Sequence, residues 1–255
     1  MSLSLRSWRR LFTPIALLVA WQASASLGLV NPDFVGSPLG VAASLYDQAT
    51  TGDLAWHLAV SLARALVGLA IGAGAGLALG VIVGLSRAGE DFLDSTLQAI
   101  RTLPLLGLIP LFILWFGLGE TPRIVMIALG SFFPIYVNVF KGIRGVDARL
   151  IELAHSYRLG RWRLVVDVIL PAALPSALVG LRYAIGIAWL CLVVAEQVNA
   201  TSGLGYVIIQ ANQLGQTSVI IMALAIYAVV GVLADAIVRL VERRALRWQR
   251  AFQGA

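Results

Sequence analysis

The sequence predicts an all-helical integral membrane protein that crosses the bilayer six times and forms one transmembrane domain over residues 1–255. Hydrophobic residues make up 59% of the chain and charged residues only 13%, whereas a soluble domain usually contains about 25% charged residues. The mean hydropathy of the chain is +0.87. Six apolar runs have roughly the 20 residues that a membrane-spanning helix needs. They are approximately residues 11–29, 58–85, 103–118, 124–140, 174–198 and 219–240.

The positions of the basic residues indicate how these spans are oriented, because Lys and Arg are retained on the cytoplasmic side of a membrane. Of the 19 Lys and Arg residues, 16 lie in the terminal segments, in the loop between spans two and three, or in the loop 141–173. The opposite side has only Arg123. We therefore expect both termini in the cytoplasm and residues 31–56 and 199–216, which contain neither Lys nor Arg, outside. The net charge of +6 could suggest nucleic acid or an acidic partner, but in a membrane chain the distribution of the basic residues matters more than their sum.

The first and third spans have features that need a separate interpretation. Residues 6–25 combine a basic start, an apolar middle and an Ala-Ser-Ala cleavage pattern, as a signal peptide does. Five further spans follow, which favours an uncleaved first helix. Pro104 and Pro110 predict an irregular third helix, because proline removes backbone hydrogen bonds that only protein neighbours can replace within lipid.

The second span contains five glycines spaced four residues apart. They are Gly68, Gly72, Gly76, Gly80 and Gly84. Glycines at this spacing form one groove along a helix and let a second backbone approach closely, which is how helices associate in lipid. The spacing predicts a packing surface, either against the same chain or against a second copy of it.

Four ionisable residues lie within the spans or at their ends: Arg64, Arg182, Glu196 and Asp235. Such residues usually face the interior of a helix bundle and are candidates for a substrate pathway. Their depths also match in pairs, Arg64 with Glu196 near the outer side and Arg182 with Asp235 near the inner side. Asp235 and Arg239 are a helical turn apart and can pair too. We favour these structural pairings over direct contact with substrate.

The sequence contains little that would support catalysis or metal binding. Its only histidines, His57 and His155, lie on opposite sides in this topology, and no metal-ligand spacing or Ser-His-Asp order is evident. The single cysteine, Cys191, has no intrachain partner. The only lysine, Lys141, follows a phenylalanine and not the glycine-rich turn of a phosphate-binding loop. Energy for uphill transport would therefore come from an ion gradient or from another subunit.

The loop 141–173 contains a short amphipathic helix that begins after Asp147, a suitable N-cap. The helical period puts four apolar side chains on one face: Leu150, Leu153, Ala154 and Tyr157. A helix of this kind either lies on lipid headgroups or inserts its apolar face into a cleft of a partner protein. The small side chain of Ala154 leaves a notch in the middle of this face, which favours a protein partner.

This helix and the residues after it resemble the EAA loop of the inner-membrane permeases of binding-protein-dependent ATP-binding-cassette importers. The pattern of that family is Glu-Ala-Ala, three residues, Gly, nine residues, and Ile-x-Leu-Pro. Here "ELA" stands at 152–154 and "VILP" at 168–171. Arg158 replaces the expected glycine and Gly160 follows two residues later, so we expect the turn after the helix to be shifted.

Nearly the whole chain resembles one branch of this family, which imports aliphatic sulfonates, taurine, nitrate or bicarbonate, and among these it is most similar to the aliphatic sulfonate permeases. The segments that carry the resemblance are "LPLLGLIPLFILWFGLGE", "FFPIYVNVFKGIR", "ILPAALPSALVGLRYAIGIAWL" and "VAEQVNATSGLGY". The resemblance implies a type I importer permease in the bacterial inner membrane. It further implies a second permease copy, an external solute-binding protein, and two cytoplasmic ATPase subunits that bind ATP and magnesium, with no cofactor in this chain.

We therefore expect a translocation path for a small oxyanion, above all an aliphatic sulfonate, with taurine, nitrate or bicarbonate as alternative cargos. The residues expected to dock the ATPase are Leu150, Glu152, Leu153, Ala154, Tyr157, Arg158, Gly160 and Pro171, of which Pro171 would end the loop before span five restarts. A secondary carrier is the main rival, but it should show an inverted repeat, and none is visible. A membrane enzyme is disfavoured by the missing catalytic cluster.

Overall fold

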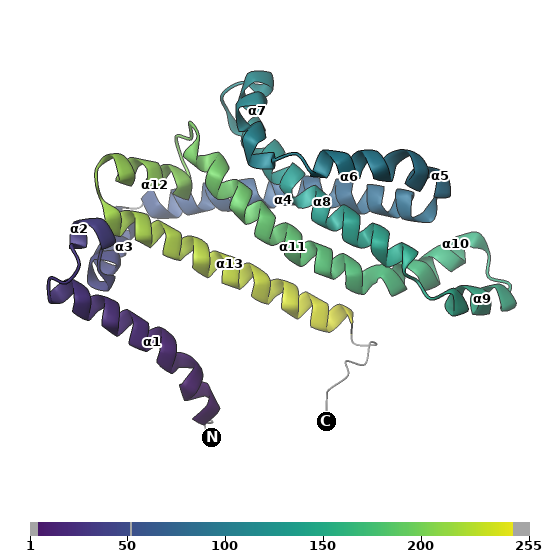
Figure 1. Ribbon diagram of the computed structural model, residues 1–255, viewed down its shortest axis with the longest axis horizontal. Coiled ribbons are helices and arrows are strands. Elements are labelled where there is room, and N and C mark those ends of the chain that lie inside the picture. The colour runs from purple at the N-terminus through teal and green to yellow at the C-terminus, as the bar shows by residue number, and fades with distance from the viewer. Residues whose placement is uncertain (1–4, 52, 247–255) are drawn as a thin grey trace. The chain divides into compact units, whose positions relative to one another are not determined.

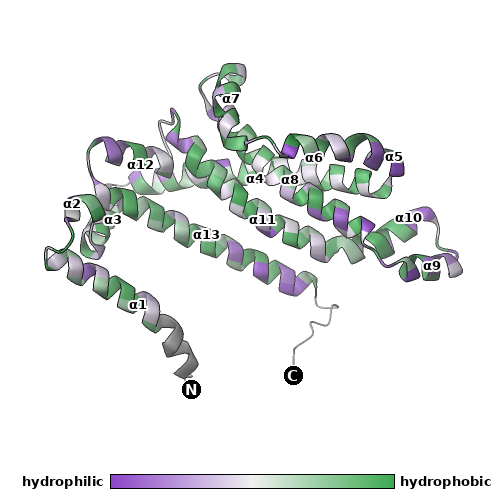
Figure 2. Ribbon diagram, viewed as in Figure 1, coloured by the Kyte–Doolittle hydropathy of each residue, from purple (hydrophilic) through white to green (hydrophobic). Residues whose placement is uncertain are grey.

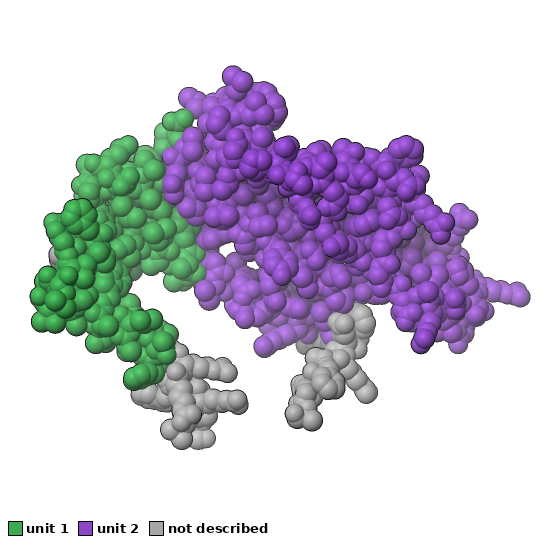
Figure 3. Space-filling model, viewed as in Figure 1, with its two compact units in different colours: residues 1–60, 199–229 green, residues 61–198, 230–255 purple. Residues whose placement is uncertain are grey.

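The computed structural model describes residues 5–51 and 53–246, with the backbone alone for residues 5–11 and 32, and these ranges contain helices and no strand (Figure 1). The chain forms two compact units (Figure 3). Unit 1 comprises residues 1–60 and 199–229, and unit 2 comprises residues 61–198 and 230–255. Two long helices, α4 (Asp53–Leu85) and α13 (Thr217–Ala245), contribute to both.

Unit 2 is built around α8 (Glu120–Arg144), which lies between α4 and α11 (Leu170–Gln197). Half of the apolar part of α8 is buried within the chain. Its side chains Ile135 and Val139 form one core cluster together with Ala184 of α11. Hydrophobic residues dominate α4, α8, α11 and α13, whereas polar residues gather on the last turns of α13 (Figure 2). Long helices made mostly of apolar residues are what a bilayer requires of its spanning segments.

Four helices of the described chain are long and apolar enough to cross a bilayer. They are Asp53–Leu85, Glu120–Arg144, Arg161–Gln197 and Thr217–Ala245. A fifth is obtained if the bent pair Arg87–Arg101 and Leu105–Phe116 is one span. The first expected span falls on α1 (Leu5–Ser26), whose apolar part, Phe12–Ser26, is shorter. The count of six therefore stays a prediction.

The third expected span, 103–118, is not one continuous helix. It consists of a 3-10 turn, Leu105–Leu108, followed by α7 (Ile109–Phe116), which at 8 residues is about 12 Å long against a hydrocarbon thickness of about 30 Å. The segment before it, expected as a loop, is helical: α5 (Arg87–Gly89), a π-helical turn (Glu90–Asp94) and α6 (Ser95–Arg101). The two parts meet at an angle of 82°.

Proline explains the position of this break. Pro104 has no N–H to donate, and its ring disfavours the helical conformation of the residue before it. Its own backbone is extended, with φ −69° and ψ 97°. The irregularity expected in the third span is therefore a full bend of the chain. The α7 helix ends at Gly117, whose φ of +74° is a conformation that favours glycine.

The helix of span five begins earlier than expected. It runs without interruption from Arg161 to Gln197, through α10 (Arg161–Arg163), a π-helical turn (Leu164–Ile169) and α11. The expectation that Pro171 separates the loop from the span was wrong, because Pro171 lies inside this helix. The π-helical turn just before it changes the backbone hydrogen-bonding pattern, which lets the helix pass a residue without an N–H.

Unit 1 contains α1, α2 (Pro32–Val35), α3 (Pro38–Thr51), α12 (Leu204–Gln213) and the first turns of α4 and α13. The Thr217 hydroxyl donates a 2.5 Å hydrogen bond to the Asp33 carbonyl, and the backbone N–H of Gly203 donates to Nδ1 of His57 at 3.1 Å. The segments 31–56 and 199–216, expected as outer loops, are therefore largely helical and held by polar contacts.

Candidate functional site

A buried group of charges joins α4, α8 and α11. The Arg64 guanidinium contacts Glu196 at 2.7 Å and Glu120 at 2.5 and 2.6 Å. The Ser61 hydroxyl lies 2.8 Å from both carboxylate oxygens of Glu196, and Arg123 pairs with Glu120 at 2.9 Å. The side chains of Arg64 and Glu196 are only 3% and 0% exposed. Ionised groups persist at such depth only when they are paired and hydrogen-bonded.

The Arg64–Glu196 pair is the one expected from matched depth, whereas Glu120 was missed. Glu120 lies in the short polar segment between the third and fourth expected spans, so hydropathy does not predict that it joins the bundle. Its side chain is 54% exposed. The one available signal was its i, i+3 spacing to Arg123, which is typical of a helical ion pair.

A second group of charges connects α11 to α13. Arg182 lies 3.4 Å from Asp235 and 2.7 Å from Glu242, and Asp235 also pairs with Arg239. Both of the expected pairings of Asp235 are present. These side chains are 30–56% exposed, and ion pairs that accessible contribute little to stability.

The five glycines that are spaced four residues apart in the second span all face α8 of the same chain. We call Gly68, Gly72, Gly76, Gly80 and Gly84 the glycine seam. A Cβ atom added at Gly76 would lie 2.6 Å from the Phe132 carbonyl oxygen, and one at Gly72 would overlap the carbonyl oxygen of Ala128. Gly74, on another face of α4, has nothing within 4 Å. Of the two alternatives, the structure therefore places the seam against the chain's own helix.

The short helix of the loop is α9 (Ala148–Ser156), capped by Asp147, whose carboxylate accepts a 2.9 Å hydrogen bond from the Arg149 N–H. Leu150, Leu153 and Tyr157 are 45%, 53% and 75% exposed. Ala154 is only 4% exposed, because α9 packs against the π-helical turn Leu164–Ile169. The expectation that Ala154 offers a notch to a partner is corrected accordingly, since the chain itself already covers that side chain.

The turn after α9 is not shifted, contrary to expectation. Arg158 itself adopts the left-handed conformation, with φ +53°. Its N–H donates to the His155 carbonyl at 2.8 Å, and the Leu159 N–H donates to the Ala154 carbonyl at 3.1 Å, which together form a Schellman motif. Gly160 has an extended backbone, φ −65° and ψ 156°, that any residue can adopt. Glu152, Arg158, Gly160 and Pro171 are all exposed.

Cys191 and His57, which could in principle take part in catalysis or metal binding, lie in surroundings that are typical of helix packing. Cys191 is 1% exposed within α11, and His57 lies 5.6 Å from the ring of Tyr206. Within residues 5–51 and 53–246, no group of three or more His, Cys, Asp or Glu side chains could hold a metal ion. The polar groups of the site are thus arranged for packing, pairing and surface contact.

Comparison with known proteins adds a family and several relatives. The model of the family described as "Binding-protein-dependent transport system inner membrane component" matches residues 72–247. The protein named as aliphatic sulfonates transport permease SsuC in Bacillus subtilis (strain 168) is 44% identical over 244 residues, 96% of this chain and 88% of that protein. Its namesake in Escherichia coli (strain K12) is 46% identical over 241 residues, 94% and 92% of the two chains.

More distant matches agree with this assignment. The taurine transport system permease protein TauC of Escherichia coli (strain K12) is 34% identical over 246 residues, which cover 94% of this chain and 90% of TauC. Among solved structures, an inward-facing form of the MetNI methionine ABC transporter superposes with a TM-score of 0.62 at 22% identity. That superposition covers 72% of this chain and 92% of the other and concerns the fold alone.

Proposed function

Because this chain belongs to the family of binding-protein-dependent transport system inner membrane components, we propose that it is the permease subunit through which aliphatic sulfonates enter the cell. The observation that supports this cargo is the difference in identity among its relatives. The two SsuC proteins are 44% and 46% identical to the chain, whereas TauC is 34% identical over a similar length. Membership of this family argues against both a secondary carrier and a membrane enzyme. Taurine, nitrate and bicarbonate remain the alternative cargos.

The assembly we propose contains two copies of this permease in the inner membrane, with both termini of each in the cytoplasm. A solute-binding protein delivers the cargo from outside. Two ATPase subunits bind ATP and magnesium on the cytoplasmic face and contact the exposed side chains of α9, namely Leu150, Leu153 and Tyr157.

Coupling in this proposal follows from how α9 is attached. It packs against the π-helical turn at 164–169, which is part of the same continuous helix as α11. The α11 helix in turn packs along α8, the most buried helix of unit 2. When the ATPase pair closes on ATP, a displacement of α9 therefore moves α11 and α8 directly, because no slack segment intervenes between Arg161 and Gln197.

Uptake measurements in cells test the proposed cargo. Cells that express this permease with its ATPase and binding protein are supplied with radiolabelled ethanesulfonate, taurine, nitrate or bicarbonate. We expect ATP-dependent accumulation of ethanesulfonate in excess of the other three, and none when the permease is omitted. Preferential accumulation of another anion would assign the cargo to that compound and leave the importer assignment intact.

A further inference from the structure

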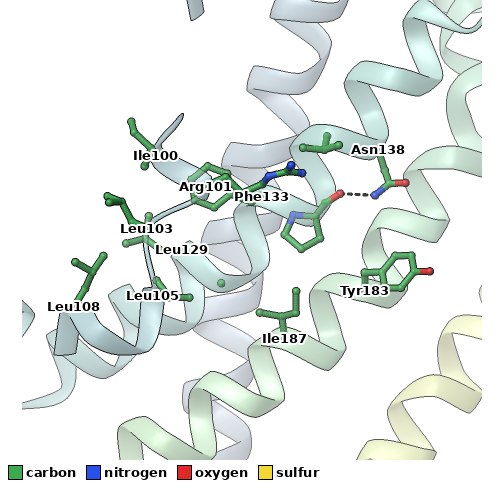
Figure 4. Close-up of a pocket in the computed structure, with 13 residues that line it drawn as sticks. Ile100, Arg101, Leu103, Leu105, Leu108, Leu129, Phe133, Asn138, Tyr183 and Ile187 are labelled. Atoms are coloured by element: carbon green, nitrogen blue, oxygen red, sulfur yellow. Dashed lines mark hydrogen bonds between the residues drawn. The ribbon is translucent and has the colours of Figure 1, made fainter. Parts of the chain in front are cut away.

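A pocket with a volume of about 400 Å³ lies in unit 2 between the bent segment, α8 and α11 (Figure 4). Both arms of the 82° bend contribute to it, with Arg101 before the break and Leu105 after it. Phe133 comes from α8 and Ile187 from α11. Ligand pockets in proteins usually measure about 300–1,000 Å³, so this one suits a small molecule.

The wall of the pocket is apolar apart from the side chains of Arg101, Asn138 and Tyr183. Leu105, Leu129, Phe133 and Ile187 supply hydrophobic surface, and Arg101 is the only charged side chain among the described residues that line it. In the view of Figure 4 the Arg101 side chain overlaps that of Phe133 from α8, which lines the same pocket. A single cation on an apolar wall is complementary to a molecule with one negative end and a hydrocarbon body.

Arg101 lines the pocket without a carboxylate partner among the residues that the structure describes. Arg64, Arg123 and Arg182 all form ion pairs, whereas the guanidinium of Arg101 makes no hydrogen bond or ion pair with residues 5–51 or 53–246. Arg101 is exposed and lies on the cytoplasmic side in the expected topology. An anion that enters the pocket can therefore reach its guanidinium.

We propose that this pocket holds an alkanesulfonate on its way through the permease, with Arg101 against the sulfonate and Leu105, Leu129, Phe133 and Ile187 against the alkyl chain. The inference rests on the proposed function and narrows its substrate class. An inorganic anion such as nitrate would leave the apolar wall without contacts. Taurine would bring an ammonium group into a wall in which no described residue is acidic, and desolvating an unpaired charge is costly.

A cysteine-protection experiment tests the pocket directly. The full chain is purified with its ATPase subunits in nanodiscs of zwitterionic lipid, in a Cys191→Ala background, with Leu129→Cys as the reporter. We expect hexanesulfonate, supplied at about nine times its dissociation constant, to slow maleimide modification of this cysteine about tenfold, because only the unoccupied pocket then reacts. Hexylammonium and taurine should not protect. Leu77→Cys, which is exposed on α4 outside the pocket, is the matched control and should react at one rate throughout.

Two further variants identify the groups responsible. Arg101→Gln should abolish protection and Arg101→Lys should retain part of it, because the charge is kept. Ile187→Trp fills the apolar part of the pocket, so it should weaken protection by octanesulfonate while sparing protection by ethanesulfonate. If the Arg101→Gln variant does not assemble, the Ile187→Trp variant still tests the pocket through its different effects on octanesulfonate and ethanesulfonate.

Three results would overturn the proposal. The first is equal protection with Arg101→Gln and with the native arginine. The second concerns nanodiscs that contain added phosphatidylglycerol. If this lipid slows modification of the reporter cysteine, and hexanesulfonate then has no further effect, a lipid headgroup is the counter-ion of Arg101. The third is absence of protection in a transporter that accumulates ethanesulfonate, which would leave the proposed function standing. If cells accumulate no sulfonate at all, the proposed function fails first and this inference fails with it.

Discussion

Arg158 occupies a backbone conformation that favours glycine, and this single residue ends α9. Its φ of +53° costs a residue with a side chain about 1–2 kcal/mol relative to the right-handed region. The two hydrogen bonds of the Schellman motif hold it there. The family pattern has glycine at this position, so the turn keeps its geometry although the sequence departs from the pattern.

We expect Arg158→Gly to stabilise the turn by about 1 kcal/mol, because glycine removes the steric cost while losing more entropy on folding. Hydrogen exchange of the Leu159 amide, which is bonded to the Ala154 carbonyl, should slow accordingly. Gly160→Ala is the control, since an extended backbone accepts alanine. Equal changes in the two variants would show that the left-handed conformation carries no strain.

The second prediction at this scale concerns the buried charges. Arg64→Met removes the Arg64 guanidinium from the buried Glu196 carboxylate, and breaking a buried pair in this way typically costs about 3–5 kcal/mol. The double variant Arg64→Met with Glu196→Met should cost less than Arg64→Met alone, because neither member of this pair is then left buried without the other.

Thermal unfolding of the purified chain in detergent measures both variants. The control is Arg182→Gln, whose pairs are partly exposed and should contribute at most about 1 kcal/mol. Strictly additive losses at Arg64 and Glu196 would mean that the two side chains do not depend on each other.

At the scale of the elements, the glycine seam determines how closely α4 and α8 approach. We expect Gly72→Ala to destabilise the chain by roughly 1–3 kcal/mol, the usual cost of overpacking, because the new methyl group meets the α8 backbone. Gly74→Ala, two residues away on the same helix with nothing within 4 Å, should be neutral or stabilising by up to about 1 kcal/mol. Melting temperatures that fall equally in both variants would contradict the packing role.

The α9 helix carries the fourth prediction. Leu153→Arg should abolish co-purification of the ATPase and transport together, because it puts a charge in the middle of the exposed apolar face, where Leu153 is 53% exposed. Ser156→Arg, an exposed position on the polar face of the same helix, is the control and should retain both. A Leu153→Arg transporter that still binds its ATPase would disprove docking through this face.

Hydropathy and spacing were sufficient to predict the long helices, the amphipathic α9 and the ion pair between Arg64 and Glu196, because each depends on local composition or on depth in the membrane. The bend at Pro104 was only partly predictable. Proline disfavours a helix there, but whether the chain kinks or turns through 82° depends on the helices around it. Burial of Ala154 was not predictable, because it depends on a contact with residues 164–169 that no local pattern encodes.

For the whole molecule, the distribution of basic residues predicts the orientation in the membrane. In a Cys191→Ala background, a membrane-impermeant maleimide applied to intact cells should modify Asp47→Cys and spare His155→Cys. Both positions are exposed, so accessibility within the chain does not decide the result. Alanine is chosen at position 191 because a serine hydroxyl would be buried among apolar neighbours. Labelling of His155→Cys alone would reverse the assigned orientation.

In the proposed assembly, the uninterrupted helix Arg161–Gln197 would act as a lever on the scale of the entire permease. At 37 residues and 1.5 Å per residue it is about 55 Å long, which exceeds the roughly 40–45 Å of a whole bilayer with its headgroups. A tilt of about 10° of its α11 part, which at 28 residues is about 42 Å long, would displace the end next to α9 by roughly 7 Å. A modest closure of the ATPase pair would then need only a small angular change in the bundle, and the stiffness of this helix, more than the strength of any contact, would set how faithfully one movement becomes the other.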